Sequence, residues 1–415
     1  MMMNLYLFDD NNIASVFGIG TYIRELVFTL EYSGIHIHVV HLNSNRPTFE
    51  IEKTNQIEHW FIPKVNNNEI SFNSIKRIED YFLNVLYLLR LHIPVDTENL
   101  IFHFNYNQYQ WLAKELKTVF KCTTVATVHF FKWMIELQGN LSMFHTIKAK
   151  PETQLNSFER SLLKTDEYES LLYKEVDKVI VLSQDTKNYL CNEYQMDANK
   201  IMMIPNGLSS NAPAITDIPF FRKKWKLSDE FIIIFAGRLQ PVKGLTFLIK
   251  AFHNVLKIIP NCRLIIAGSG NYDMYLKESK DICTKITFTG FLEKKDLYEL
   301  YQIADIGIVP SLYEPFGYVA IEMMMHCLPM VVTATSGLNE VVDDTCGLKV
   351  SIIEHLGRIE IDIDLLTEKI LYLLHHPIEA KQMGQNGQKR FLEKYSSVIF
   401  KENMLEFYNS CVRSE

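Results

Sequence analysis

The most informative segment of the sequence is "ADIGIVPSLYEPFGYVAIE", residues 304–322. Its first part, residues 304–311, is an apolar run that ends in Pro and Ser, which is typical of a buried strand that leads into a loop. Beyond Gly317 the apolar residues recur at helical spacing and predict a helix that packs on a sheet and begins near Gly317 or Tyr318. The stretch therefore predicts a strand, a loop and a helix in that order.

Two carboxylates occupy defined places in this predicted unit. Glu314 falls in the loop at the carboxyl end of the strand, and Glu322 falls about one turn inside the helix, roughly 6 Å along its axis. Between them lies the amino end of the helix, where free N–H groups attract anions. The pattern indicates a cradle for a phosphate group that is flanked by hydroxyl groups.

Short apolar runs alternate with longer amphipathic segments on both sides of this stretch, and this alternation is typical of parallel sheets with crossover helices. In the first half the runs are NLYLF (4–8), IHIHVVHL (35–42), NLIFHF (99–104), CTTVATV (122–128) and DKVIVLS (177–183). In the second half they are FIIIFA (231–236), RLIIA (263–267), ITF (286–288), IGIVP (306–310), PMVVT (329–333) and GLKV (347–350).

A gap separates the two series, and it contains "PNGLSSNAPAITDIP" (205–219), which is rich in Pro, Asn, Ser and Gly. We read this gap as a linker and place the boundary near Leu208. The chain is thus predicted to be an α/β protein with two doubly wound, Rossmann-like domains, residues 1–208 and 209–395, that face each other across a cleft. Ligands of such sheets bind beyond the carboxyl ends of the strands.

Composition narrows the class of protein. The chain of 415 residues has 47% hydrophobic and 22% charged residues, as expected for a globular protein, and its net charge of -7 argues against nucleic acid as a partner. The seven cysteines are scattered without a C-x-x-C pair, which fits reduced thiols in the cytoplasm. The amino terminus lacks the features of a signal peptide, and no apolar run approaches 18 residues. We therefore expect a cytoplasmic protein that does not span a membrane.

The strand-end loop "FAGRLQPVKG" (235–244) carries Arg238 and Lys243, and two cations at this spacing suit a diphosphate. The alternative is a pair of solvated surface charges, but the position beyond a strand, together with the two glutamates, favours the diphosphate. "VATVHFFKW" (125–133) places His129 where another apolar run ends. There it could donate to a sugar hydroxyl or a phosphate oxygen, or serve only as a structural residue.

Three further patterns carry weaker information. "FGIGTYIREL" (17–26) places Gly18 and Gly20 before a helix, either as room for a ligand or as a turn, and lacks the third glycine of a dinucleotide fingerprint. "DID" (362–364) resembles a metal-binding Asp-x-Asp motif, but it opens a helical pattern, where acidic residues serve the helix dipole. We expect no bound metal. "RKKWK" (222–226) is read as a solvated helix face rather than a contact with acidic lipid.

With these pieces in order, nearly the whole chain resembles the retaining GT-B glycosyltransferases of family 4. The resemblance rests on these segments: SGIHIHVVHL, VDKVIVLSQDTKNYL, MMIPNGL, FAGRLQPVKG, LIIAGSGN, ITFTGF, PSLYEPFGYVAIE and MGQNGQKRFLEKYS. Two glutamates separated by seven residues, in this context, are its most specific element. The resemblance implies a GT-B fold with an acceptor-side first domain and a donor-binding second domain, and a last helix, 396–415, that packs back on the first domain.

The resemblance also implies roles for individual residues. Arg238 and Lys243 would hold the donor diphosphate, and Glu322 would accept hydrogen bonds from the nucleotide ribose. Glu314, with the N–H groups of Phe316 and Gly317, would hold the hydroxyls of the donor sugar. The remaining implied contacts are His129 with that sugar, Gly18 and Gly20 beside the diphosphate, and Thr289, Gly290 and Phe291 beside the base.

The implied activity is that of a retaining hexosyltransferase without metal or cofactor, whose nucleoside diphosphate sugar is a co-substrate. UDP-sugar is the favoured donor and GDP-sugar the alternative. The acceptor hydroxyl would be carbohydrate, lipid-linked or protein-linked, in polysaccharide, glycolipid or glycoconjugate synthesis, with peripheral contact at the inner face of the membrane. The rival readings are a GT-B nucleotide-sugar epimerase and a non-catalytic partner subunit.

Two features depart from the family pattern: Cys327 stands where glycine is usual, and the segment 131–170 matches nothing and is expected to shape acceptor binding.

Overall fold

The chain forms two compact units in the computed structural model, which describes residues 3–10, 18–64, 74–94, 96–210, 217–355 and 357–412. Unit 1 comprises Met1–Phe131, Asn156–Gly207 and Ser397–Glu415. Unit 2 comprises Lys132–Leu155 and Leu208–Ser396. Each unit is therefore built from segments that are distant in the sequence.

This division corrects the predicted domain of residues 1–208, because Lys132–Leu155 belongs to unit 2. The segment holds the short helices α4 (Lys132–Glu136) and α5 (Leu141–Lys148), and its buried rings Trp133 and Phe144 stack with their centroids 4.1 Å apart. The later passage from unit 1 to unit 2 falls between Gly207 and Leu208, within the segment read as a linker.

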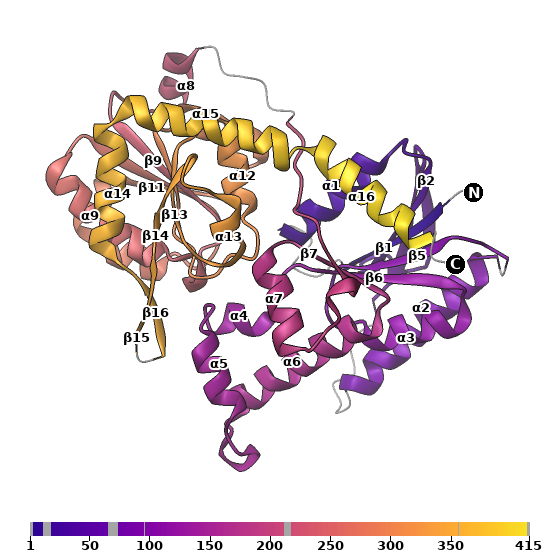
Figure 1. The fold of residues 1–415 in the computed structure, drawn as a ribbon. Coiled ribbons are helices and arrows are strands. Elements are labelled where there is room, and N and C mark those ends of the chain that lie inside the picture. The colour runs from indigo at the N-terminus through magenta and orange to yellow at the C-terminus, as the bar shows by residue number, and fades with distance from the viewer. Residues whose placement is uncertain are drawn as a thin grey trace. The chain divides into compact units, whose positions relative to one another are not determined.

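Unit 1 is an eight-stranded sheet in the order β3-β4-β2-β1-β5-β6-β7-β8, in which all neighbours are parallel except the antiparallel pair β3 and β4. Its strands are β1 (Met3–Asp10), β2 (Ile35–Ser44), β3 (Glu50–Thr54), β4 (Ile57–Pro63), β5 (Leu100–Phe104), β6 (Cys122–Val128), β7 (Lys178–Val181) and β8 (Ile201–Met203). Its helices are α1 (Gly18–Leu30), α2 (Ser74–His92), α3 (Gln110–Val119), α6 (Ser157–Glu175), α7 (Gln184–Glu193) and α16 (Ser397–Val412). The last of these, α16, lies beside α1 (Figure 1).

Unit 2 is built around a six-stranded parallel sheet in the order β11-β10-β9-β12-β13-β14, with the separate hairpin β15-β16. The strands are β9 (Phe231–Ala236), β10 (Cys262–Ala267), β11 (Ile286–Gly290), β12 (Ile306–Val309), β13 (Met330–Thr333), β14 (Gly347–Val350), β15 (Ile352–His355) and β16 (Arg358–Ile361). The helices besides α4 and α5 are α8 (Ile218–Lys224), α9 (Leu245–Ile258), α10 (Asp273–Glu278), α11 (Lys294–Ile303), α12 (Tyr318–Met325), α13 (Ser336–Val341), α14 (Ile363–His375) and α15 (Pro377–Lys394).

Helices cover both faces of the six-stranded sheet, with α9 and α14 packed together and α12 packed on α15 (Figure 1). The apolar strand runs explain this arrangement, because a strand that is buried on both faces carries few polar residues. All six residues of β9 except Phe231 are buried. The predicted α/β fold with two doubly wound parallel sheets is thus confirmed.

In each sheet there is one point, the reversal point, from which successive strands are added first on one side and then on the other. In unit 2 the chain runs from β9 outward to β10 and β11 and then returns to β12 on the other side of β9. The loops after β9 and β12 therefore emerge next to each other at the carboxyl edge, where ligands of doubly wound sheets bind. The corresponding point in unit 1 lies between β1 and β5.

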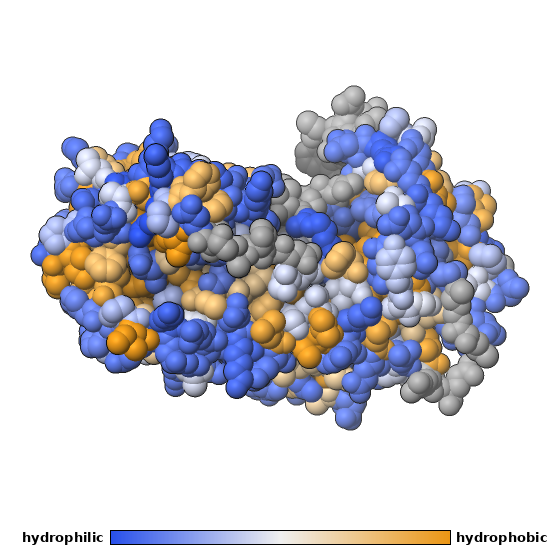
Figure 2. Space-filling model, turned by 90° about the horizontal axis from the view of Figure 1, so that it is seen from above, coloured by the Kyte–Doolittle hydropathy of each residue, from blue (hydrophilic) through white to orange (hydrophobic). Residues whose placement is uncertain are grey.

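Within the ranges described above, every helix is too short or too polar to cross a lipid bilayer. On the face shown in Figure 2, hydrophilic residues predominate and the hydrophobic residues are scattered in small groups.

Asp362 accepts a hydrogen bond from the N–H of Leu365 at 2.9 Å and is the N-cap of α14, so the reading of "DID" as a helix start is confirmed.

Cys327 follows the C-cap of α12, His326, and adopts the left-handed conformation with φ of 55°. The N–H of Cys327 donates to the carbonyl of Met324 and the N–H of Leu328 donates to the carbonyl of Met323, the two bonds of a Schellman motif. This motif favours glycine at the position of Cys327, because a side chain strains the left-handed conformation.

We therefore expect Cys327→Gly to stabilise unit 2 by about 0.5–1 kcal/mol, and Cys327→Ala to give no such gain because alanine keeps the strain. Urea denaturation of the three proteins measures the difference. A glycine variant no more stable than the alanine variant would contradict this account of the helix end.

Candidate active site

Two loops meet at the reversal point of unit 2. The loop after β9 closes with a short 3-10 turn, Pro241–Lys243, and Gly244 is then the N-cap of α9 with φ of 68°. A methyl group at Gly244 would lie 1.8 Å from the carbonyl oxygen of Pro310, which follows β12. Glycine is thus required where the two loops touch, for its backbone conformation and for its lack of a side chain.

An ion pair joins the two loops. Lys243 Nζ lies 2.6 Å from Glu314 Oε2, and the two side chains are 19% and 16% exposed. Ser311 Oγ also donates to Glu314 Oε2, at 3.3 Å. The sequence placed Lys243 and Glu314 on neighbouring loops, and the structure brings their charges into contact. A partly buried pair of this kind is screened less by salt than a surface pair.

Arg238 is half-buried on the same loop as Lys243. Burial lowers the pKa of its guanidinium, and the negative charge of Glu314 opposes that shift. Arg238 nevertheless remains charged, because a guanidinium is not deprotonated in proteins. The carboxyl edge of the unit 2 sheet therefore carries two cations, Arg238 and Lys243, and one carboxylate, Glu314.

The amino end of α12 lies directly beyond Glu314. Gly317 caps the helix with φ of 106°, and Tyr318 is its first residue, as the sequence predicted. Among the described residues, no acceptor takes a hydrogen bond from the N–H of Phe316 or Gly317. These two N–H groups and the helix end can bind an anion or an oxygen atom of a ligand.

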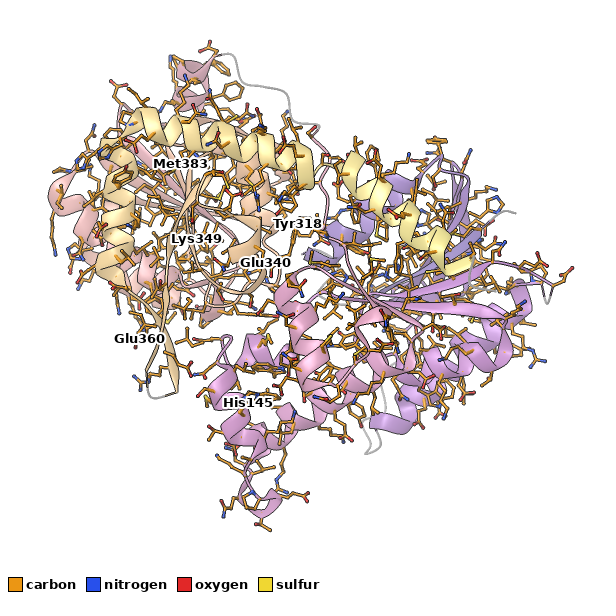
Figure 3. The ribbon with its side chains drawn as sticks, viewed as in Figure 1. His145, Tyr318, Glu340, Lys349, Glu360 and Met383 are labelled. Atoms are coloured by element: carbon orange, nitrogen blue, oxygen red, sulfur yellow. The ribbon has the colours of Figure 1, made fainter. Side chains whose placement is uncertain are left out.

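Three neighbours hold the loop that carries Glu314. Thr335 Oγ1 donates to the carbonyl of Leu312 at 2.9 Å, and the N–H of Leu338, in α13, donates to the carbonyl of Glu314 at 3.3 Å. A methyl group at Gly139 would lie 3.2 Å from the Leu312 oxygen, so the segment Lys132–Leu155 packs against the same loop. Figure 3 shows α12 and α13 through Tyr318 and Glu340.

Glu322 is 1% exposed and lies about one turn inside α12. Its Oε1 forms an ion pair with Lys294, the first residue of α11, and its Oε2 accepts from Tyr301 OH at 3.4 Å. Burial and the charge of Glu322 raise the pKa of Tyr301 well above its ordinary value, so Tyr301 stays a donor. Lys294 and Tyr301 were not predicted from the sequence. A ribose at Glu322 would have to share the carboxylate with Lys294, whose side chain is 50% exposed.

The segment predicted to lie beside the base ends β11. Gly290 is the last residue of this strand, has φ of 76° and accepts from the N–H of Gly268 at 2.8 Å. Phe291 follows and is 56% exposed. An exposed ring beyond a strand end is available to stack on a flat ligand.

The remaining predicted residues lie in unit 1. His129 directly follows β6, as predicted, and its Nε2 lies 3.2 Å from Asn105 Oδ1. Gly18 and Gly20 do not precede α1 but form its first turn, which corrects their predicted place before a helix. The helix extends over both glycines because glycine can adopt the helical conformation, and Gly20 is buried whereas Gly18 is exposed. Residues 11–17 lie outside the described residues.

Two family models match the chain and together cover most of it. The model for Glycosyltransferase Family 4 matches residues 16–211, and the model for Glycosyl transferases group 1 matches residues 217–390. The division between the two matches falls in the segment that was read as a linker.

Individual relatives agree with these models. A region of 176 residues is 36% identical to an uncharacterised glycosyltransferase of Methanocaldococcus jannaschii and covers 40% of this chain and 44% of that protein. A D-inositol 3-phosphate glycosyltransferase of Segniliparus rotundus is 29% identical over 256 residues, or 59% of this chain and 55% of that protein. The chain thus spans about half the length of the curated relatives it matches.

Solved structures share the fold over the whole chain. Sucrose-phosphate synthase from Thermosynechococcus elongatus has a TM-score of 0.77 at 20% identity and covers 100% of both chains. HepE from Anabaena, in complex with UDP-glucose, has a TM-score of 0.71 at 15% identity and covers 98% of this chain and 100% of the other.

Two doubly wound parallel-sheet units are the fold of GT-B glycosyltransferases. The chain belongs to the group 1, family 4 glycosyltransferases of this class, as the matches to both of its halves show.

Proposed function

We propose that the protein is a retaining hexosyltransferase that moves a sugar from a nucleoside diphosphate sugar to an acceptor hydroxyl. The observation that carries the proposal is the contact of Lys243 with Glu314 beside the N–H groups of Phe316 and Gly317. Diphosphate needs cations and N–H donors, whereas sugar hydroxyls need an acceptor such as a carboxylate. Lys243 and the N–H groups of Phe316 and Gly317 meet the first requirement, and Glu314 beside them meets the second.

The proposed division of labour follows from charge. Arg238 and Lys243 neutralise the diphosphate as it leaves, and Glu314 accepts from hydroxyls of the sugar whose ring becomes positive. Such preorganised electrostatic stabilisation is usually the largest single contribution to catalysis. Glu322 accepts from the ribose while Lys294 and Tyr301 hold its carboxylate in place. The loop at Gly290 borders the base.

We propose that the configuration is retained by front-face attack, in which the acceptor approaches the same face of the sugar that the diphosphate leaves. The bond between the anomeric carbon and the phosphate oxygen breaks, and the acceptor oxygen bonds to that carbon. The leaving phosphate oxygen takes the proton of the acceptor hydroxyl, so no further base is needed. Arg238 and Lys243 lower the cost of the charge on that oxygen.

We favour a UDP-sugar as donor. In support, a solved structure of the same fold is a complex with UDP-glucose. A relative in Corynebacterium glutamicum, 30% identical over 198 residues, is named as GDP-mannose-dependent, so a GDP-sugar is the second candidate. We propose a carbohydrate, lipid-linked or protein-linked acceptor, and that the segment Lys132–Leu155 shapes its binding because it packs against the loop of Glu314.

The test is calorimetry with UDP, GDP and ADP and their sugars, followed by transfer assays with the donor that binds and a panel of acceptors. The anomeric configuration of the product, read by NMR, decides between retention and inversion. An altered nucleotide sugar in the absence of acceptor would indicate an epimerase instead. Nucleotide binding with no turnover on any acceptor would favour a non-catalytic subunit.

We expect transfer to continue in EDTA at an unchanged rate, because Arg238, Lys243 and backbone N–H groups meet the charge of the diphosphate. The rate is measured before and after chelation, with added magnesium or manganese as the control. A loss on chelation that either ion restores would contradict the metal-free mechanism.

A further inference from the structure

The amide of Asn105 has a fixed orientation. Asn105 follows β5 at the carboxyl edge of unit 1 and is 1% exposed. Its Nδ2 donates to the backbone carbonyl of Phe8 at 3.2 Å. A carbonyl can only accept, so the amide group that faces it must be the NH₂. The Oδ1 of Asn105 therefore faces the other way.

That oxygen faces His129. Asn105 Oδ1 lies 3.2 Å from His129 Nε2, and an amide oxygen can only accept, so Nε2 must carry the proton. Burial lowers the pKa of His129 to about 3, so the ring is neutral at pH 7. A neutral imidazole carries one proton, so Nδ1 has a lone pair, and no described residue forms a hydrogen bond with it.

A buried network holds the ring in this place. The Tyr22 ring meets His129 edge to face with centroids 4.7 Å apart, and Tyr22 OH lies 3.2 Å from Thr127 Oγ1. Thr127 Oγ1 lies 2.7 Å from His103 Nε2, and His103 Nδ1 lies 2.7 Å from Tyr408 OH in α16. Every member has a partner, which makes the network rigid. The ring of His129 is thus held by the hydrogen bond at Nε2 and by its packing against Tyr22.

We propose that Asn105 is a positioning residue that holds His129 as the Nε2–H tautomer and so makes His129 Nδ1 an acceptor for a substrate hydroxyl. This reverses the role expected from the sequence, in which the histidine donates. A phosphate oxygen has no hydrogen to offer, so the group bound at His129 is a hydroxyl and not the diphosphate. That the hydroxyl belongs to the transferred sugar rests on the proposed function.

The tautomer is measured directly on the ligand-free protein. In a long-range ¹H–¹⁵N correlation spectrum of deuterated, histidine-labelled protein, each ring shows which nitrogen carries the proton, and His129→Gln identifies the signals of His129. We expect the proton on Nε2 alone at pH 7. A proton on Nδ1, an equal mixture or a charged ring would overturn the proposal. This result does not depend on any activity.

Two variants of Asn105 test its part in this. Asn105→Asp keeps an oxygen that accepts from His129 Nε2, so the proton should stay on Nε2. Asn105→Leu removes the acceptor, so a fraction of the protein should carry the proton on Nδ1 instead. Thermal denaturation and the spectrum of the other histidines show whether each variant is folded. If Asn105→Leu is folded and the Nε2–H tautomer persists unchanged, Asn105 does not position it.

Donor analogues test the direction of the hydrogen bond. Deoxy sugars lose the hydroxyl, and deoxyfluoro sugars keep an acceptor but lose the hydrogen. At the hydroxyl that His129 contacts, we expect both analogues to lower kcat/KM about tenfold, the effect of one lost hydrogen bond. Full activity of a fluoro analogue whose deoxy counterpart fails would show that His129 donates. If no nucleotide sugar binds at all, the proposed function fails while the tautomer result stands.

Discussion

Replacement of Glu314 by glutamine is expected to lower turnover about 100-fold while the bare nucleoside diphosphate binds at least as tightly as before. The carboxylate acts on a sugar ring that gains positive charge, and only interactions that strengthen in the transition state raise turnover. The same carboxylate forms an ion pair with Lys243, with Glu314 Oε2 2.6 Å from Lys243 Nζ. Its removal leaves Lys243 available to the diphosphate.

Glu322→Gln is the matched control, because it removes a carboxylate on the other side of the amino end of α12. We expect it to weaken the binding of the bare diphosphate and to change turnover little, since a ribose gains no charge in the reaction. Calorimetry and transfer kinetics on both variants give the comparison. If Glu314→Gln abolishes nucleotide binding and Glu322→Gln leaves it intact, the two roles are wrongly assigned.

Truncation after Ser396 is expected to prevent unit 1 from folding. The truncation removes α16, whose buried side chains include Phe400, Met404, Phe407 and Tyr408. At roughly 1.5–3 kcal/mol each, their loss is on the order of 10 kcal/mol, which approaches the whole stability of a typical domain. His103 would also lose its partner at Nδ1.

Thermal and urea denaturation of the truncated chain measure this loss. Tyr408→Phe is the graded control, because it removes the hydrogen bond to His103 and keeps the ring, and it should cost only about 1–2 kcal/mol. Equal melting temperatures for the native and truncated chains would show that α16 does not stabilise unit 1.

The parallel sheets could be predicted because their central strands are buried on both faces and read as unbroken apolar runs. The run 231–236 coincides with β9, and the run 347–350 coincides with β14. The antiparallel edge strand β3 could not be found in this way. Its sequence, EIEKT, has four polar residues and no buried one, because it pairs at an edge in contact with water.

The site residues likewise differ in whether a local sequence pattern could predict them. Lys243 and Glu314 could be predicted because a residue that follows a strand in a doubly wound sheet lies at the carboxyl edge. Lys294 could not, because a lysine at the start of a helix looks like a surface charge until its partner, far along the chain, is known. The packing of Gly139 against Leu312 likewise depends on a contact that no local pattern records.

The exchange of segments between the two units bears on how the protein is made. During synthesis all of unit 2, Lys132–Leu155 and Leu208–Ser396, leaves the ribosome before α16 does. Domains usually complete folding in the order in which they are translated. Here unit 1 is the first to begin synthesis and the last to be completed. Until α16 has been synthesised, His103 in β5 lacks its hydrogen-bond partner Tyr408. Stalled translation near the end of the message would therefore leave a finished second unit tethered to an unfinished first one.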